Sequence, residues 1–246
     1  MNTLHITERR VQRVRHELHR RAVTVQQVDR PSPHFARITF ADAALRGFVS
    51  DGFDDHLKFI FTGADGEPVR RDYTPAAFDR QAGTVTVEFA LHGDGAASNW
   101  ARQASPGQRA VLAGPRGSMM VDSDFAWHLL VGDATALPAI ARRLAELPAG
   151  VRAISIVQLA DVRDQRALPS AAQLQQHWVA DAPALVAALQ DLALPASDGY
   201  AWCAGEAGTM ARLRSLLLAK GQPKEAMRVA AYWKRGASEF HQDLVD

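Results

Sequence analysis

Cysteine is nearly absent from this sequence, since Cys203 is the only one among 246 residues. A single cysteine excludes an internal disulfide and a cage of thiolate ligands around a metal. A surplus of charge is missing too, because 28 Lys and Arg oppose 27 Asp and Glu, for a formal net charge of +1. The composition therefore disfavours a protein that binds nucleic acid or an anionic membrane through its overall charge.

Long hydrophobic runs are also missing. Charges interrupt the opening stretch MNTLHITERRVQRVRHELHRR, and no uncharged segment approaches the roughly 18 apolar residues of a membrane span. We therefore expect a soluble protein without a secretion signal or stable membrane association, and the cysteine count fits a reducing cytoplasm.

Positive charge is concentrated at the start of the chain, where residues 1–30 hold seven Arg. Val11, Val14 and Leu18 recur there at helical spacing, which predicts a short amphipathic helix or a frayed basic arm over residues 1–20. A solvated surface is the favoured interpretation of this arm, ahead of a partner-binding segment.

The rest of the chain shows two different residue patterns. Over residues 21–124, short β-rich runs such as AVTVQQV, HFARITF and GTVTVEFAL alternate with turn sequences, and one helix is indicated near residues 97–103. This pattern predicts an antiparallel barrel or sandwich. Over residues 125–246, apolar strands such as WHLLVGD and YAWCAGE alternate with amphipathic helices, which predicts a parallel sheet covered on both faces.

The first candidate site is Arg71-Asp72-Tyr73-Thr74, at the end of a β segment. In an extended chain Arg71 and Tyr73 point to one face and Thr74 to the other. A guanidinium can hold a phosphate, a phenol can pack against a planar ring, and a hydroxyl offers one hydrogen bond. Taken alone, the segment is better explained as a strand end with surface charges.

The second candidate is His92-Gly93-Asp94-Gly95-Ala96-Ala97-Ser98-Asn99-Trp100-Ala101, where small residues run directly into a helix. Free backbone N–H groups at such a start can bind phosphate, although an ordinary loop is the commoner explanation. The segment is not a dinucleotide fingerprint, because the third glycine is missing.

Two further candidates are strand-to-helix turns, Leu130-Val131-Gly132-Asp133-Ala134-Thr135-Ala136-Leu137-Pro138-Ala139-Ile140 and Cys203-Ala204-Gly205-Glu206-Ala207-Gly208. Both follow apolar strands, at the edge where open α/β sheets bind ligands. Each turn alone is an ordinary capped turn, but two in one sheet favour a nucleotide crevice.

Together with Gly114-Pro115-Arg116-Gly117-Ser118 and Tyr232-Trp233-Lys234-Arg235-Gly236, these motifs stand in an order that resembles the siderophore-interacting proteins. These are flavin-dependent ferric-chelate reductases of the ferredoxin-reductase superfamily. The resemblance covers about residues 20 to 242 and depends on six ordered motifs. It implies an FAD-binding β-barrel over 21–124 and an NAD(P)H-binding α/β domain over 125–246, whose C-terminal segment returns to the flavin site.

The resemblance also implies roles for individual residues. Arg71 would pair with the FAD phosphates, with Asp72 beside it, Tyr73 would lie against the flavin ring, and Thr74 would bond the flavin. The pyrophosphate and adenosine side would be lined by His92, Gly95, Ala96, Ala97 and Ser98. The nicotinamide nucleotide would meet Gly132, Asp133, Thr135, Ala136, Gly205 and Glu206.

An anionic ferric chelate requires cations near the flavin. The resemblance and the positions suggest Lys58, Lys234 and Arg235, with Arg116 as a weaker addition and Trp233 beside them. Each cation alone is equally well explained as a solvated charge. No acid, base or nucleophile is required, because the flavin performs the chemistry. The nine histidines show no ligand spacing, so we expect no resident metal, and iron belongs to the substrate.

Several alternatives remain open at this stage. The electron donor can be NADPH, NADH or a ferredoxin, and Arg163 or Arg166 could read a ribose 2′-phosphate or simply be exposed. The chain can also be a flavoprotein that reduces a ferredoxin, free flavin or a protein partner, or a siderophore-binding protein without redox function.

Overall fold

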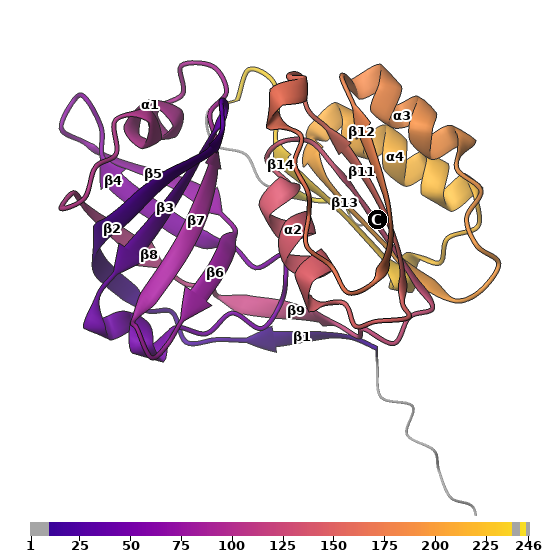
Figure 1. The fold of residues 1–246 in the computed structure, drawn as a ribbon, viewed down its shortest axis with the longest axis horizontal. Helices are drawn as coiled ribbons and strands as arrows, with labels where there is room; N and C mark the ends of the chain where they lie inside the picture. Colours follow the sequence, from indigo (N-terminus) through magenta and orange to yellow (C-terminus); the bar gives the residue numbers. More distant parts are fainter. Residues whose placement is uncertain (1–9, 238–241, 245–246) are drawn as a thin grey trace, which may run out of the picture.

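The computed structural model of the chain describes residues 10–237 and 242–244. The first nine residues of the predicted basic arm, and residues 238–241 and 245–246 of the C-terminal segment, lie outside the described residues. The described part contains an antiparallel half and a mostly parallel α/β half that lie side by side (Figure 1). No helix in these ranges is long and apolar enough to cross a bilayer.

The first half is a seven-stranded antiparallel sheet that curves around its own core, as predicted (Figure 1). Its strand order is β5-β4-β8-β2-β3-β7-β6. The strands are β2 (Arg20–Ser32), β3 (Phe35–Ala41), β4 (Leu57–Thr62), β5 (Pro68–Tyr73), β6 (Pro75–Asp79), β7 (Thr84–Ala90) and β8 (Arg109–Ala113). Alternate residues such as Phe40, Phe59 and Phe89 face inward, and helix α1 (Ala96–Arg102) packs Trp100 against their rings.

The predicted N-terminal helix is wrong. Residues Val11–Arg15 form strand β1, which pairs antiparallel with β9 (Gly117–Val121) in a separate two-stranded sheet. The β-branched Val11 and Val14 suit a strand, and pairing with β9 satisfies the backbone polar groups of both segments. Leu18 is 50% exposed, so the apolar stripe that the helix required is not buried.

The second half is a six-stranded sheet in the order β12-β11-β10-β13-β14-β15. Its members are β10 (Trp127–Gly132), β11 (Arg152–Gln158), β12 (Gln173–Val179), β13 (Gly199–Glu206), β14 (Met227–Trp233) and the short antiparallel β15 (Gln242–Asp243). The helices are α2 (Leu137–Glu146), α3 (Ala182–Asp191) and α4 (Ala207–Ala219). Short 3-10 helices complete the described elements: η1 (Ala43–Gly47), η2 (Val162–Asp164) and η3 (Lys224–Ala226).

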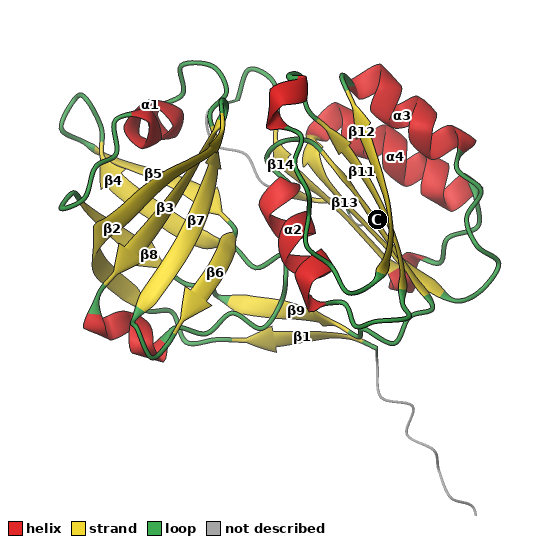
Figure 2. Cartoon of the chain, viewed as in Figure 1, coloured by secondary structure: helices red, strands yellow, loops and turns green. Residues whose placement is uncertain are grey.

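Helices cover both faces of this sheet, as the continuous apolar strands predict (Figure 2). Leu130 of β10 packs in one core with residues of α2, whereas Leu129 and Val131 pack in another with residues of α3 and α4. Successive side chains of one strand point to opposite faces, so a strand that is apolar throughout serves both cores.

Strand β10 is the point at which the order of strand addition reverses: β11 and β12 lie on one side of it, and β13 and β14 on the other. The chain leaves β10 and β13 at the same edge, because the two strands are parallel. Open α/β sheets bind ligands at such switch points. Here the turn that begins at Gly132 lies beside the turn that begins at Gly205.

Candidate functional site

A cavity of about 780 Å³ lies between the two halves. Its wall is formed by His56, Lys58, Arg70, Arg71, Asp72, Tyr73, Thr74, Glu88, Ala90, His92, Gly95, Ala96, Ala97, Ser98, Thr135, Pro138, Tyr232, Trp233 and Ala237. The structure thus brings together the β5 motif, the loop before α1, Thr135, Trp233 and Lys58. These segments come from distant parts of the sequence.

Strand β5 and the residue after it bring all four residues of the first motif to the cavity. Arg71 stands opposite Phe59 of β4, and Tyr73 stands opposite Leu57, so both lie on the inward face of the sheet. The Tyr73 ring packs on Phe59 and Phe89 at centroid distances of 5.9 and 4.3 Å. Burial raises the pKa of the Tyr73 phenol, so this wall residue stays neutral.

Lys58 and Asp72 form an ion pair across β4 and β5, with Nζ donating to Oδ2 at 2.7 Å. Lys58 is half exposed, whereas the second oxygen of Asp72 is buried without a hydrogen-bond partner among the described residues. The amine therefore remains accessible to an anion, but Asp72 already balances part of its charge.

The loop before α1 closes another side of the cavity. Ser98 turns its hydroxyl back to donate to the carbonyl of His92 at 3.2 Å, which anchors the loop to the helix. A Cβ added at Gly95 would meet no heavy atom within 4 Å, so the space beside this backbone is open. Small residues on the wall leave room for a ligand to approach the main chain.

Asp133 organises the second half of the site, at the switch point of the sheet. Its Oδ1 accepts hydrogen bonds from the N–H and the hydroxyl of Thr135, at 2.9 and 2.6 Å. Its Oδ2 accepts from the N–H of Glu206 at 3.0 Å and from Nε1 of Trp233 at 2.8 Å. One carboxylate thus joins the turns after β10 and β13 to the end of β14.

Glycine is required at position 205 for this arrangement. A Cβ there would lie 2.5 Å from Oδ2 of Asp133, and the backbone has a φ of +152°. The close approach of the two turns therefore depends on a missing side chain.

Trp233 also connects the two halves. Its ring stacks on His92, with centroids 6.0 Å apart and planes 26° from parallel. Tyr232, the residue before it, is largely buried, and burial raises the pKa of its phenol. The motif of β14 therefore reaches the cavity wall through Tyr232 and Trp233.

Not every expected residue lines the cavity. Asp133, Gly132, Ala136, Gly205 and Glu206 stand behind the wall, in the two turns that carry Thr135 and receive Trp233. Lys234 and Arg235 follow β14 and are exposed, and Arg116 is exposed just before β9. These three cations are outside the described wall.

Sequence reasoning missed five informative wall residues: His56, Arg70, Glu88, Pro138 and Tyr232. His56 lies two residues before Lys58, so strand alternation could have found it. Pro138 and Tyr232 belong to quoted motifs, but neither was given a role there. Glu88 gave no such signal, because its position depends on contacts from elsewhere in the chain.

Glu88 explains the placement of Arg166. The buried Glu88 carboxylate accepts from Arg37 at 2.9 Å and is contacted by the guanidinium of Arg166, from the other half. Arg166 also lies over the ring of Phe35, 4.8 Å from its centroid. Arg163 is instead exposed and pairs with Asp161. Arg166 would therefore have to break its contact with Glu88 in order to bind a ribose 2′-phosphate.

The donor set of the cavity fits a flavin dinucleotide. Guanidinium and imidazole groups of Arg70, Arg71 and His92 can bind phosphates, while the rings of Tyr73 and Trp233 supply aromatic surface. The volume lies within the range of about 300–1,000 Å³ usual for ligand sites. Among the described residues no group of three His, Cys, Asp or Glu side chains could hold a metal ion.

Each half of the chain matches a model of a known protein family. Residues 125–236 match the model described as "Siderophore-interacting protein", and residues 24–67 and 62–119 match "Siderophore-interacting FAD-binding domain". The NADPH-dependent ferric-chelate reductase of Escherichia coli is 36% identical over 249 residues, covering 92% of this chain and 98% of that protein. The ferric vibriobactin reductase of Vibrio cholerae is 26% identical, covering 86% of this chain and 89% of that protein.

Solved structures have the same fold. A siderophore utilization protein from T. fusca superimposes with a TM-score of 0.88 at 29% identity, covering 94% of this chain and 98% of that one. A siderophore-interacting protein from Aeromonas hydrophila gives a TM-score of 0.80 at 27% identity, with 91% and 93% coverage. A flavohemoglobin with bound FAD and heme, only 15% identical, shares the fold with a TM-score of 0.65.

Proposed function

Because this chain belongs to the family of siderophore-interacting proteins, we propose that it is a ferric-siderophore reductase with FAD as its bound cofactor and NADPH or NADH as its electron donor. Residues 21–124 would form the FAD-binding unit and residues 125–246 the NAD(P)H-binding unit. The observation that carries this proposal is the cavity between the halves, with cationic side chains and an aromatic wall in one space.

FAD, when bound, would accept two electrons from the donor and pass them on one at a time to a one-electron acceptor. The task of the chain is to bind and orient it. We assign Arg71 to the phosphates, Tyr73 to the ring and Thr74 to a hydrogen bond with the flavin, with Asp72 holding Lys58 beside them. We assign the loop of His92, Gly95, Ala96, Ala97 and Ser98 to the pyrophosphate and adenosine side.

The nicotinamide nucleotide would approach from the switch point of the second sheet. Asp133 keeps Thr135 and Trp233 in place there, so the Gly132–Ala136 and Gly205–Glu206 turns present one rigid edge. A preorganised edge lowers the entropy lost when a nucleotide binds. NADPH is the donor named for the Escherichia coli relative, and we propose NADPH ahead of NADH for this chain.

The substrate would be an anionic ferric chelate. Lys58 would attract it from the cavity wall, with Lys234, Arg235 and Arg116 as further cations and Trp233 as an aromatic contact. Lowering the charge of the iron from Fe(III) to Fe(II) weakens its attraction to anionic oxygen ligands, which releases the metal. The cations bind the chelate without taking part in bond cleavage.

One anaerobic experiment tests the proposal. We expect purified protein to be yellow, to lose its colour with NADPH, and to regain it when a ferric siderophore is added while Fe(II) forms. A colourless protein that binds ferric siderophore without reducing it would identify a redox-inactive carrier. A yellow protein that reduces ferredoxin or free flavin, but no ferric chelate, would identify a reductase with a different acceptor.

A further inference from the structure

A second, smaller cavity of about 250 Å³ lies between the connection from β1 to β2, the end of η1 and the turn after β8. Its wall shares no residue with the large cavity. It is lined by Arg15, His16, Glu17, His19, Arg21, Gly47, Val49, Gly114 and Pro115. Four of these side chains are cationic or can become so, against one carboxylate. The chain as a whole is nearly neutral, so this wall gathers positive charge locally.

Arg21 is the central feature of the small cavity. Only 7% of the residue is exposed, yet no carboxylate interacts with its guanidinium among the described residues. It donates instead to the carbonyls of Ala44, Gly47 and Gly114, at 3.1, 3.1 and 3.2 Å. Carbonyl dipoles offset only part of the cost of burying a full charge, and Nη1 and Nη2 each carry a second hydrogen.

The ring of Phe48, 5.6 Å from Cζ of Arg21, adds an aromatic contact, but no neighbouring carboxylate among the described residues balances the charge. Nε2 of His16 lies 2.7 Å from the hydroxyl of Ser118 and 3.9 Å from Asp51. Nε2 of His19 lies 3.5 Å from Glu17, whose side chain is 85% exposed. Both carboxylates face water, and each has an imidazole rather than Arg21 as its partner.

We propose that this cavity binds a small oxyanion, a phosphate or a carboxylate group, with Arg21 at its base and Arg15 and His19 at its rim. A guanidinium matches the geometry of both oxyanions, and charge-assisted hydrogen bonds are about twice as strong as neutral ones. The volume equals that of about eight water molecules at about 30 Å³ each, which is enough for the anion and part of its hydration. The site is independent of the reductase function proposed above.

The test uses the FAD-loaded protein, titrated with sodium phosphate in a calorimeter at constant ionic strength set by sodium chloride. Because Arg21→Met removes three structural hydrogen bonds and can unfold the protein, the variant to compare is Arg15→Gln/His19→Gln. We expect it to bind phosphate about tenfold more weakly than the native protein. Arg13→Gln, on the same strand but outside the wall, should bind it as the native protein does.

A second measurement locates the anion. In NMR spectra, phosphate should shift the imidazole signals of His16 and His19 and leave those of His177 on β12 unchanged. Binding of citrate without phosphate would support the site and identify a carboxylate as the occupant. Absence of binding of both anions up to about 10 mM, or equal binding by the native protein and the double variant, would overturn the proposal.

Discussion

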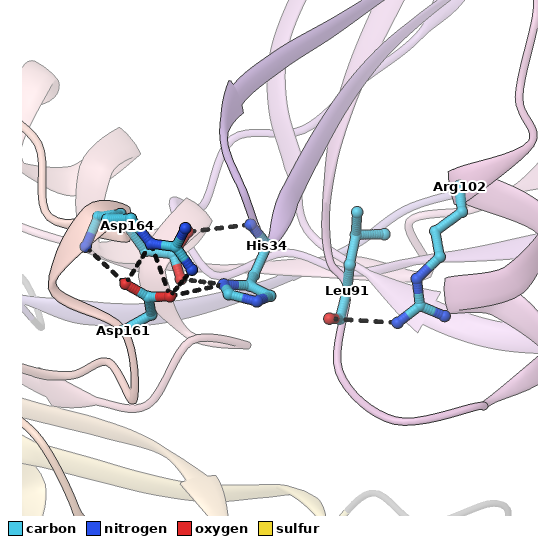
Figure 3. A network of polar contacts seen from close by, with 6 residues as sticks. His34, Leu91, Arg102, Asp161 and Asp164 are labelled. Atoms are coloured by element: carbon cyan, nitrogen blue, oxygen red, sulfur yellow. Dashed lines mark hydrogen bonds and ion pairs between the residues drawn. The ribbon is translucent and has the colours of Figure 1, made fainter.

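Asp164 holds His34 by two contacts at once. Oδ1 of Asp164 accepts the backbone N–H of His34 at 3.0 Å, and Oδ2 lies 2.8 Å from its ring Nδ1 (Figure 3). Asp164 ends the 3-10 helix after β11, whereas His34 lies in the turn between β2 and β3. Together with the contact between Arg166 and Glu88, this clasp joins the second half to the wall of the large cavity.

The clasp predicts a stability loss for Asp164→Ala. Because the carboxylate is buried, its removal leaves the His34 N–H without its acceptor, and we expect a decrease of about 1–3 kcal/mol in the free energy of unfolding. Urea unfolding followed by circular dichroism measures it. The exposed Arg163→Gln, on the same 3-10 helix, serves as a control with no measurable effect, and equal midpoints for both variants would contradict the prediction.

Asp133→Ala should weaken nucleotide binding without loss of FAD. The substitution releases Trp233, Glu206 and Thr135 from their common acceptor, so the edge that we propose for the nicotinamide nucleotide loses its order. We expect the KM for NADPH to rise about tenfold, by a larger factor than the FAD dissociation constant measured by flavin fluorescence.

Asp181→Ala provides the matched control for that change. Asp181 caps α3 by accepting the N–H of Ala184 at 2.8 Å, and it is outside the cavity wall. It should cost about 1 kcal/mol of stability and leave the KM for NADPH unchanged. If both variants altered KM equally, the effect would come from stability and the assignment of Asp133 would be wrong.

Lys58→Ala combined with Lys234→Ala should raise the KM for an anionic ferric chelate. Two positive charges are lost near the proposed substrate path, whereas NADPH oxidation with a neutral acceptor should persist. Because Asp72 already offsets Lys58, we expect Asp72→Asn to lower this KM, which is a change of opposite sign. Steady-state rates measure the KM for the chelate and the rate with the neutral acceptor in both variants, with Lys224→Ala on η3 as a control. An unchanged KM in the double variant would remove Lys58 and Lys234 from the substrate site.

Stability should fall in mild acid because of His128. Burial, followed by the nearby Arg143, lowers the pKa of this imidazole from 6.5 to about 3. Between these two values the unfolded chain binds a proton that the folded chain does not, so stability decreases as the pH falls. From pH 7 to pH 5 the loss from this residue is about 2 kcal/mol.

The measurement is urea unfolding at both pH values for the native protein and for His128→Phe. The variant should lose less stability on acidification, because it has no group to protonate at this position and its ring can pack with Phe125 and Tyr200. His177→Phe, at an exposed position of β12, should retain the native response. Identical acid sensitivity of the native protein and His128→Phe would contradict the prediction.

Regular patterning made the fold predictable. Short β-rich runs between turns, such as β3 and β7, indicated an antiparallel sheet, and unbroken apolar runs in β10 and β13 indicated a parallel one covered on both faces; both predictions are confirmed. Strand β12, with the sequence QLQQHWV, was not recognised, because an edge strand with exposed polar residues has no strong apolar period. The β1 error has a related cause, since three apolar residues cannot decide between a helix and a strand without the partner β9.

The site was predictable only in part. Motifs that run along one strand or into one helix, such as Arg71-Asp72-Tyr73-Thr74 and the loop from His92, pointed to residues that do line the cavity. Their assignment to FAD and to substrate stays a prediction. Glu88 and the pairing of Lys58 with Asp72 were missed, because both depend on which strands become neighbours.

The order of apolar and polar residues was enough by itself to specify two sheets and the turns at their edges, because burial of apolar surface acts on local periodicity. Contacts between residues far apart in the chain were decided only in three dimensions: Asp133 with Trp233, Asp164 with His34, and the buried Arg21 without an acid. The partners of a buried charged side chain come from segments that tertiary packing brings beside it, and the sequence alone does not show which segments these are.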